Sequence, residues 1–112
     1  MSQFVLLWFV NVIAPRTLRL FWEIHGRAET PLRDWQKAMQ KGDFENFNEL
    51  QAVWPHADLV RAAGNTPVII FNVGGNKYRL VVNINWTHKG VYIKRILTHA
   101  EYDVWNKGGR PV

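Results

Sequence analysis

The chain has 112 residues, a hydrophobic content of 47% and a formal net charge of +5. This length suits one folded domain, and six tryptophans with six phenylalanines supply enough apolar surface for a core, which excludes intrinsic disorder. The absence of cysteine excludes a disulfide framework, a thiolate nucleophile and a cysteine-ligated zinc site, and it fits the cytoplasm as the expected location.

The first ten residues are strongly apolar, yet we expect neither a membrane span nor a signal peptide there. The apolar stretch ends near Ala14, well short of the roughly 20 residues that a spanning helix needs. Residues 1–3 supply no basic side chain ahead of the stretch, as a signal peptide would require. We therefore interpret residues 1–10 as an N-terminal extension of uncertain origin and residues 11–112 as the domain.

A short strand and an amphipathic helix are expected at the start of the domain. Residues 11–14 are compatible with a strand. Pro15 suits the first turn of a helix over residues 16–25, and Gly26 would stop that helix. Helical spacing places four residues on one inner face: Leu18, Phe21, Trp22 and His25.

A second helix is expected to have Thr30 as its N-cap and Pro31 at its first position, and to end before Gly42. Residues 43–54 predict a loop with one or two helical turns, which Pro55 ends. The apolar residues on the inner face of the second helix are Leu32, Trp35 and Met39.

The second half of the chain predicts an antiparallel sheet, because its apolar pattern changes to the period of strands. The expected strands cover residues 67–73, 77–86 and 91–97, with turns at 74–76 and 87–90. Thr98 and Glu101 have the spacing of a capping box that starts a short last helix. The predicted fold class is α+β, with the N-terminal helices on one face of a twisted, mostly antiparallel sheet and the other face left open.

The strand register decides which side chains share a face. If Trp86 and Val91 flank the turn, residues whose numbers sum to 177 lie opposite each other. The predicted core face then holds Tyr78, Leu80, Val82, Ile84 and Trp86 beside Val91, Ile93 and Leu97, with Arg95 unexpectedly on the same side. The opposite face holds Lys77, Arg79, Val81, Asn83 and Asn85 beside Tyr92, Lys94, Ile96 and Thr98.

The positive charge is confined to the second half of the chain. Residues 1–60 carry six Lys or Arg against seven Asp or Glu, whereas residues 61–112 carry eight against two. No carboxylate occurs between Arg61 and Ala100. A sheet face that is merely solvated normally mixes both signs, whereas a face that binds phosphates must exclude carboxylates. The asymmetry therefore favours a polyanionic partner such as nucleic acid.

Chemistry on RNA is possible at the edge of this face. Cleavage through the 2′-hydroxyl needs a proton acceptor, a proton donor and a cation beside the phosphate. His99 in the first turn of the last helix and Tyr102 one turn later are candidates for proton transfer, and Tyr92 could donate a proton or stack on a base. Arg79 and Lys94 could flank the phosphate. A plain surface histidine remains the simpler interpretation of His99 from spacing alone.

No cofactor or metal site is expected. His25, His56 and His88 lack the spacing of metal ligands with one another or with nearby carboxylates. The glycine-rich segment 74–76 joins two strands and does not lead from a strand into a helix, so it is interpreted as a turn and not as a phosphate-binding loop.

Several blocks of the sequence resemble the HigB family of bacterial toxins. The resemblance covers about residues 11–104, and its most specific parts are Gly-Asn-Lys-Tyr-Arg at 75–79 and Thr-His-Ala-Glu-Tyr-Asp at 98–103. The other similar blocks are residues 14–23, 31–35 and 91–94. Members usually begin near residue 10 or 11, so residues 1–9 depart from the pattern.

The resemblance implies a RelE-like α+β fold and a metal-independent mRNA interferase that cleaves translated messages at the ribosome. It also implies a helix-turn-helix antitoxin as partner. Together with the lack of cysteine and the short apolar stretch, we expect a cytoplasmic protein with no membrane association and no small-molecule cofactor. The catalytic candidates are Arg79, Lys94, His99 and Tyr102, and the RNA-binding candidates are Asn76, Lys77, Asn83, Tyr92 and Arg95.

Two other functions are compatible with the same sequence. Some relatives in the wider superfamily inhibit DNA gyrase without cleaving RNA, and a basic sheet face also suits a plain RNA-binding module. Arg95 departs from the aromatic or apolar residue that the family pattern leads us to expect, which leaves its role open.

Overall fold

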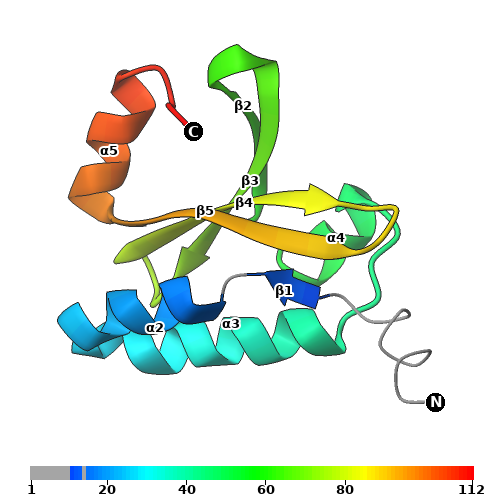
Figure 1. Ribbon diagram of the computed structural model, residues 1–112, viewed down its shortest axis with the longest axis horizontal. Helices are drawn as coiled ribbons and strands as arrows, with labels where there is room; N and C mark the ends of the chain where they lie inside the picture. Colours follow the sequence, from blue (N-terminus) through cyan, green and yellow to red (C-terminus); the bar gives the residue numbers. More distant parts are fainter. Residues whose placement is uncertain (1–10, 14) are drawn as a thin grey trace.

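The computed structural model describes residues 11–13 and 15–112, so the interpretation of residues 1–10 as an extension lies outside the described residues. A sheet forms the centre of the molecule, with helices on both of its faces (Figure 1). The expected α+β fold class is confirmed. Within the described residues, no helix is both long and apolar enough to cross a membrane.

The sheet has five strands in the order β1-β5-β4-β3-β2. Only β1 and β5 are parallel, and the other neighbours are antiparallel, as expected for a mostly antiparallel sheet. The edge strand β2 is the one strand that the sequence pattern does not predict. The strands span Asn11–Ile13 (β1), Asp58–Ala62 (β2), Thr66–Val73 (β3), Tyr78–Asn85 (β4) and Gly90–Thr98 (β5).

The two long N-terminal helices lie on one face of the sheet, below it in Figure 1. The four α-helices of the described residues span Pro15–Ile24 (α2), Glu29–Lys41 (α3), Phe47–Val53 (α4) and His99–Lys107 (α5), and short 3-10 turns cover Gly26–Ala28 and Ala63–Asn65. The predicted inner-face residues form the core beneath the sheet, where Leu18, Leu32, Trp35 and Met39 are fully buried.

The prediction that Thr30 caps the second helix is wrong. Helix α3 begins at Glu29, and Ala28 occupies the N-cap position without any side-chain capping bond. The reason lies in the preceding 3-10 turn, because the N–H of Glu29 donates to the carbonyl of Gly26. The chain is therefore already helical before Thr30, and the start of α3 needs no side-chain cap.

The second face of the sheet is partly covered, in contrast to the open face that was expected. Helix α5 packs on it through Trp105, which forms a second apolar cluster with Val68, Ile70 and Val81. Trp105 and these three side chains are all buried. The surface left for a ligand is consequently the part of this face near the start of β4 and the start of α5.

The predicted register of β4 and β5 is wrong in two respects. Next to the turn Val91 pairs with Ile84 and not with Trp86, a shift of two residues that leaves the faces unchanged. Further along, the ladder shifts between Val81 and Val82, where Lys94 is an extra, bulged residue on β5. One extra residue reverses the alternation of side chains beyond it.

The bulge exchanges the faces of the residues that follow it. Ile96 lies opposite Leu80 and packs against the main core, whereas Leu97 lies opposite Arg79 and packs in the cluster around Trp105. Thr98 lies opposite Tyr78, a core residue, and Arg95 lies opposite Val81 on the second face. The awkward core position that the predicted register gave to Arg95 is thereby removed.

Candidate active site

Arg79, the second residue of β4, is a buried cation at the centre of the site. Only 7% of its surface is exposed. Its Nη1 atom donates to the carbonyls of Asn76 and Tyr78, both at 3.2 Å. Its Nη2 atom donates to Oδ1 of Asn76 at 2.6 Å and to Nδ1 of His99 at 3.1 Å. The Nε–H group makes no hydrogen bond to the described residues and remains available to a ligand.

No carboxylate neutralises Arg79 within the described part of the chain, where the ion pairs involve other residues. A buried charge is costly unless it is paired, so proteins rarely keep one without a counter-ion. Here neutral acceptors fix the guanidinium in place and leave its charge uncompensated. Such a group is prepared to bind an anion, and a guanidinium suits a phosphate in particular.

His99 is held in position by the way α5 begins. The expected capping box is confirmed, because Glu101 N donates to Thr98 Oγ1 at 3.2 Å and Thr98 N donates to Glu101 Oε1 at 2.9 Å. The backbone N–H of His99 donates to the carbonyl of Lys77 at 2.9 Å, which ties the helix start to the β3–β4 turn. Half of the His99 side chain stays exposed, at 51%.

The contact with Arg79 determines which nitrogen of His99 carries the proton. A guanidinium nitrogen is always a donor, so Nδ1 of His99 must be the acceptor and the neutral ring carries its proton on Nε2. The Nε2 atom lies 3.8 Å from Oδ2 of Asp103, one helical turn further along α5. The lone pair of the neutral ring is therefore directed at the cation.

Tyr102 completes the group on the side of α5. The Cζ atom of Arg79 lies 5.5 Å from the centre of the Tyr102 ring, within the range of a cation–π contact. The ring of Trp105 lies 5.8 Å from that of Tyr102, so Tyr102 is supported by the second apolar cluster. Arg79, His99 and Tyr102, which were expected to act together, are indeed adjacent.

The β3–β4 turn brings Asn76 to Arg79. Gly74 and Gly75 both have positive φ angles, of 64° and 68°, which side chains other than glycine adopt only at a cost. A Cβ atom on Gly74 would also lie 3.0 Å from the ring of Tyr78. The pair of glycines allows the tight turn after which Asn76 can bind Arg79 through both its carbonyl and its side chain.

Apart from the backbone hydrogen bond between Lys77 and His99, the remaining predicted site residues make no hydrogen bond to this group. Lys77 and Lys94 are exposed, and Lys94 lies three residues along β5 from Leu97, the partner of Arg79. Asn83 donates to the carbonyl of Pro67 at 2.8 Å, and Tyr92 lies opposite it, with its hydroxyl 3.0 Å from Nε2 of His88. Arg95 donates to the carbonyl of Pro111 at 3.2 Å.

One cation of the carboxylate-free stretch serves the fold. Lys89 forms ion pairs with Asp43 at 2.5 Å and with Glu45 at 2.9 Å, and only 12% of its side chain is exposed. Hydrogen bonds from its ammonium to Asp43 and Glu45 raise the pKa of Lys89 above its ordinary value. This contact ties the β4–β5 turn to the segment between α3 and α4, so the charge of Lys89 is largely neutralised.

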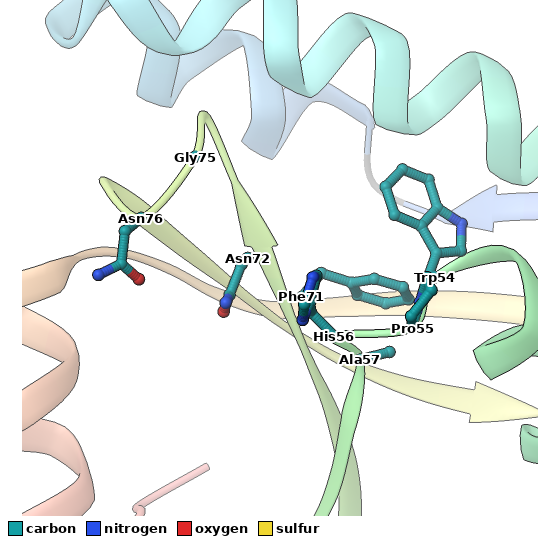
Figure 2. Close-up of a pocket in the computed structure, with 8 residues that line it drawn as sticks. All are labelled: Trp54, Pro55, His56, Ala57, Phe71, Asn72, Gly75 and Asn76. Atoms are coloured by element: carbon teal, nitrogen blue, oxygen red, sulfur yellow. The ribbon is translucent and has the colours of Figure 1, made fainter.

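A pocket of about 420 Å³ lies beside the Arg79 group, and the sequence analysis did not anticipate it. Figure 2 shows its lining, which comes from the segment before β2, the end of β3 and the β3–β4 turn. Asn72 is the residue that could have indicated it, because it interrupts the buried apolar run of β3. The lining residues are Trp54, Pro55, His56, Ala57, Phe71, Asn72, Gly75 and Asn76.

The described residues contain no group of three or more histidines and carboxylates that could hold a metal ion. The side chains available for chemistry at the site are those of Arg79, His99, Tyr102 and Asn76. Together they offer a fixed positive charge, an imidazole in contact with it and a phenol over it. This set can bind a phosphodiester and transfer protons at its oxygens.

Comparison with known proteins gives the family. Residues 28–105 match the HigB_toxin family, described as the RelE-like toxic component of a toxin-antitoxin system. The mRNA interferase toxin HigB of Escherichia coli strain K12 is 30% identical over 94 residues, which cover 84% of this chain and 88% of that protein. The mRNA interferase HigB of Shigella flexneri shows the same identity and coverage.

A third relative, the mRNA interferase HigB of Escherichia coli O6:H1, is 31% identical over 72 residues, or 64% of this chain and 68% of that protein. The family match includes the β3–β4 turn, strands β4 and β5 and the start of α5. It therefore contains Arg79, His99 and Tyr102, which meet in the structure. The RelE-like resemblance drawn from the sequence is confirmed, and this chain belongs to the HigB family of toxins from toxin-antitoxin systems.

Proposed function

We propose that this chain is an mRNA interferase, an endoribonuclease toxin that cleaves translated messages. The relatives named above are mRNA interferases, and they align with most of the chain. The observation that carries the proposal is the contact between Arg79 and His99, because it joins an uncompensated buried cation to a proton acceptor. A phosphate-binding cation and an adjacent base are what 2′-hydroxyl attack requires.

In the proposed reaction the 2′-oxygen of the substrate attacks the adjacent phosphorus while the bond from phosphorus to the 5′-oxygen breaks. Arg79 binds the phosphate and stabilises the charge that develops on it. When the phosphate takes over the Nη2 donor of Arg79, Nδ1 of His99 is released and accepts the proton of the 2′-hydroxyl. Tyr102 holds the guanidinium and donates a proton to the departing 5′-oxygen. The products are a 2′,3′-cyclic phosphate and a 5′-hydroxyl end.

The wider setting is part of the same proposal. The toxin domain comprises residues 11–112, acts in the cytoplasm on messages engaged by the ribosome, and is neutralised by a helix-turn-helix antitoxin. Outside the Arg79 group, exposed and half-buried side chains of the second face and its margins contact RNA. The proposed contact residues are Lys77, Asn83, Tyr92, Lys94 and Arg95.

The test is induction of the chain in bacteria, followed by sequencing of RNA with 5′-hydroxyl ends. The unchanged chain should stop growth and produce new ends within coding regions, and Arg79→Ala and His99→Ala should abolish both effects. Arg27→Ala is the matched control, because Arg27 is exposed in the 3-10 turn before α3 and lies outside the site. Circular dichroism of each purified variant verifies that it is folded.

Two results would contradict the proposal. Intact messages together with signs of DNA damage would favour inhibition of a protein target such as gyrase. Full cleavage by both Arg79→Ala and His99→Ala would place the active site elsewhere. Ribosome dependence is tested with a reporter message and a copy that lacks its start codon, since only the translated copy should be cut.

A further inference from the structure

The pocket beside Arg79 exists because the sheet is incomplete there. The edge strand β2 begins at Asp58, which pairs with Ile70, so residues 71–73 of β3 have no strand on that side. The segment that leads from α4 into β2 passes this open edge and forms the opposite wall. Figure 2 shows this segment, with Trp54 and His56, beside the end of β3.

The pocket and the Arg79 group share residues and are adjacent. Asn72 lies directly opposite Arg79 on the ladder between β3 and β4, so the two side chains emerge on the same face at neighbouring positions. Asn76 lines the pocket and accepts two of the hydrogen bonds from Arg79. A group bound at Arg79 is therefore at the mouth of the pocket.

The lining of the pocket suits a planar ring with polar edges. The half-buried ring of Trp54 supplies the aromatic part, and it is held edge to face at 5.6 Å against Phe71, which is buried in the core. Asn72 is exposed, and its amide makes no side-chain hydrogen bond to the described residues, so it offers both a donor and an acceptor. His56 adds an exposed imidazole.

No lysine, arginine or carboxylate lines the pocket, so it is unsuited to a second phosphate. Aromatic surfaces with amide groups at the edge are how proteins hold single nucleobases of RNA. The volume of about 420 Å³ falls in the range of pockets that enclose small organic groups.

We propose that this pocket binds the base of the nucleotide next to the phosphate held by Arg79, and that it sets the base preference of cleavage. The proposal rests on the proposed nuclease function. In this arrangement the base packs against Trp54, and Asn72 with His56 reads its hydrogen-bonding edge.

The experiment replaces the reading groups and records which bases flank the cuts. Asn72→Ala, Asn72→Ser, Asn72→Asp and His56→Ala are induced in bacteria, and 5′-hydroxyl ends are sequenced as for the unchanged chain. Loss of the Asn72 amide should weaken the base preference at one position beside the cut by about 10-fold. This is the discrimination expected from one side chain that hydrogen-bonds to the edge of a base. Asn72→Asp exchanges a donor for an acceptor, so it should favour a different base.

Asn48→Ala is the matched control, since Asn48 is an exposed residue of α4 outside the pocket. Thermal melting shows that each variant is folded. If Asn72→Asp is inactive because its carboxylate repels the phosphate, the Ala and Ser variants still decide the question. A base distribution identical to that of the unchanged chain in folded Asn72 and His56 variants overturns the proposal, as does a uniform loss of cleavage without any change in preference.

Failure of this inference is distinguishable from failure of the proposed function. If the unchanged chain makes no cuts, the nuclease proposal fails. If the unchanged chain cuts and the variants cut at the same bases with the same efficiency, only the base-reading role of the pocket fails.

Discussion

The Nη2 atom of Arg79 lies 3.1 Å from the Nδ1 atom of His99, although 20 residues separate them in the chain. Two devices bring them together: the glycine turn that returns the chain into β4 and the capping box that starts α5 next to that turn. Because a guanidinium can only donate, the contact makes Nδ1 of His99 the acceptor and so fixes the tautomer of the neutral ring in the free protein.

We predict that neutral His99 carries its proton on Nε2 in the free protein. Two-dimensional ¹⁵N NMR of the imidazole rings distinguishes the two tautomers directly. Arg79→Ala should remove the restraint and let the ring populate both tautomers, whereas Arg27→Ala should not. A ring protonated mainly on Nδ1 in the unchanged chain would contradict the geometry and the proposed release of Nδ1 by substrate.

Thr98→Ala should lower both stability and activity. Loss of an N-cap side chain costs about 1 kcal/mol, and here it also loosens the first turn of α5, which positions His99. Chemical denaturation measures the change in the free energy of unfolding, and counting 5′-hydroxyl ends measures the activity. Thr98→Ser keeps the capping oxygen and should behave like the unchanged chain. An equal loss in Thr98→Ser would show that the methyl group, and not the cap, is responsible.

Lys89→Met should reduce the free energy of unfolding by about 1 kcal/mol near pH 8. The estimate is kept small because Asp43 and Glu45 are more than half exposed, at 58% and 67%, and solvent weakens such pairs. The pKa of Lys89 is raised on folding, so this stabilisation is complete below the ordinary lysine pKa of 10.5. It is lost as the pH rises through the higher pKa of the folded state.

Denaturation curves recorded from pH 8 upward test this prediction for Lys89. The difference between the unchanged chain and Lys89→Met should shrink above about pH 10.5. Lys37→Met, an exposed position on α3, is the control and should show no such convergence. A constant difference across the whole pH range would mean that Lys89 stabilises the fold through its hydrocarbon part alone.

Lys94→Ala should reduce cleavage far less than Arg79→Ala. Removal of a fixed group that stabilises transition-state charge typically costs about 10²- to 10³-fold, which is the loss expected for Arg79. Lys94 is exposed at the bulge and does not contact the Arg79 group, so its removal should cost at most about 10-fold and mainly weaken phosphate attraction. Rates of message loss after induction provide the comparison. Equal losses in both variants would restore Lys94 to the catalytic group.

Most of the elements could be predicted from the sequence because their signals are local. Helix spacing around Trp35, the glycine turn at Gly74 and the capping box at Thr98 each depend on a few neighbouring residues, and all three appear in the structure. The start of α3 differs because the preceding 3-10 turn satisfies its first N–H group. That exception also has a local cause, but glycine and alanine leave no clear signature for it.

The site was only partly predictable because it depends on the register of distant strands. The bulge at Lys94 has no sequence signal of its own, and it alone decides that Ile96 faces the core and Arg95 the second face. The covering of the second face by Trp105 likewise depends on where α5 docks. Arg79 and His99 lie within a few positions of a turn or cap, and they are adjacent as predicted. Lys94 and Tyr92 were grouped with them in the prediction but do not contact them in the structure.

The parallel pairing of β1 with β5 determines how late in synthesis the sheet can be completed. Residues 11–13 can pair only once residues 90–92 have been synthesised, so the sheet is completed after most of the chain has been made. Arg79 and His99 belong to the same late portion. A ribosome that is still translating this chain therefore carries a nascent toxin with neither a complete sheet nor an assembled site, which delays activity until synthesis is nearly finished.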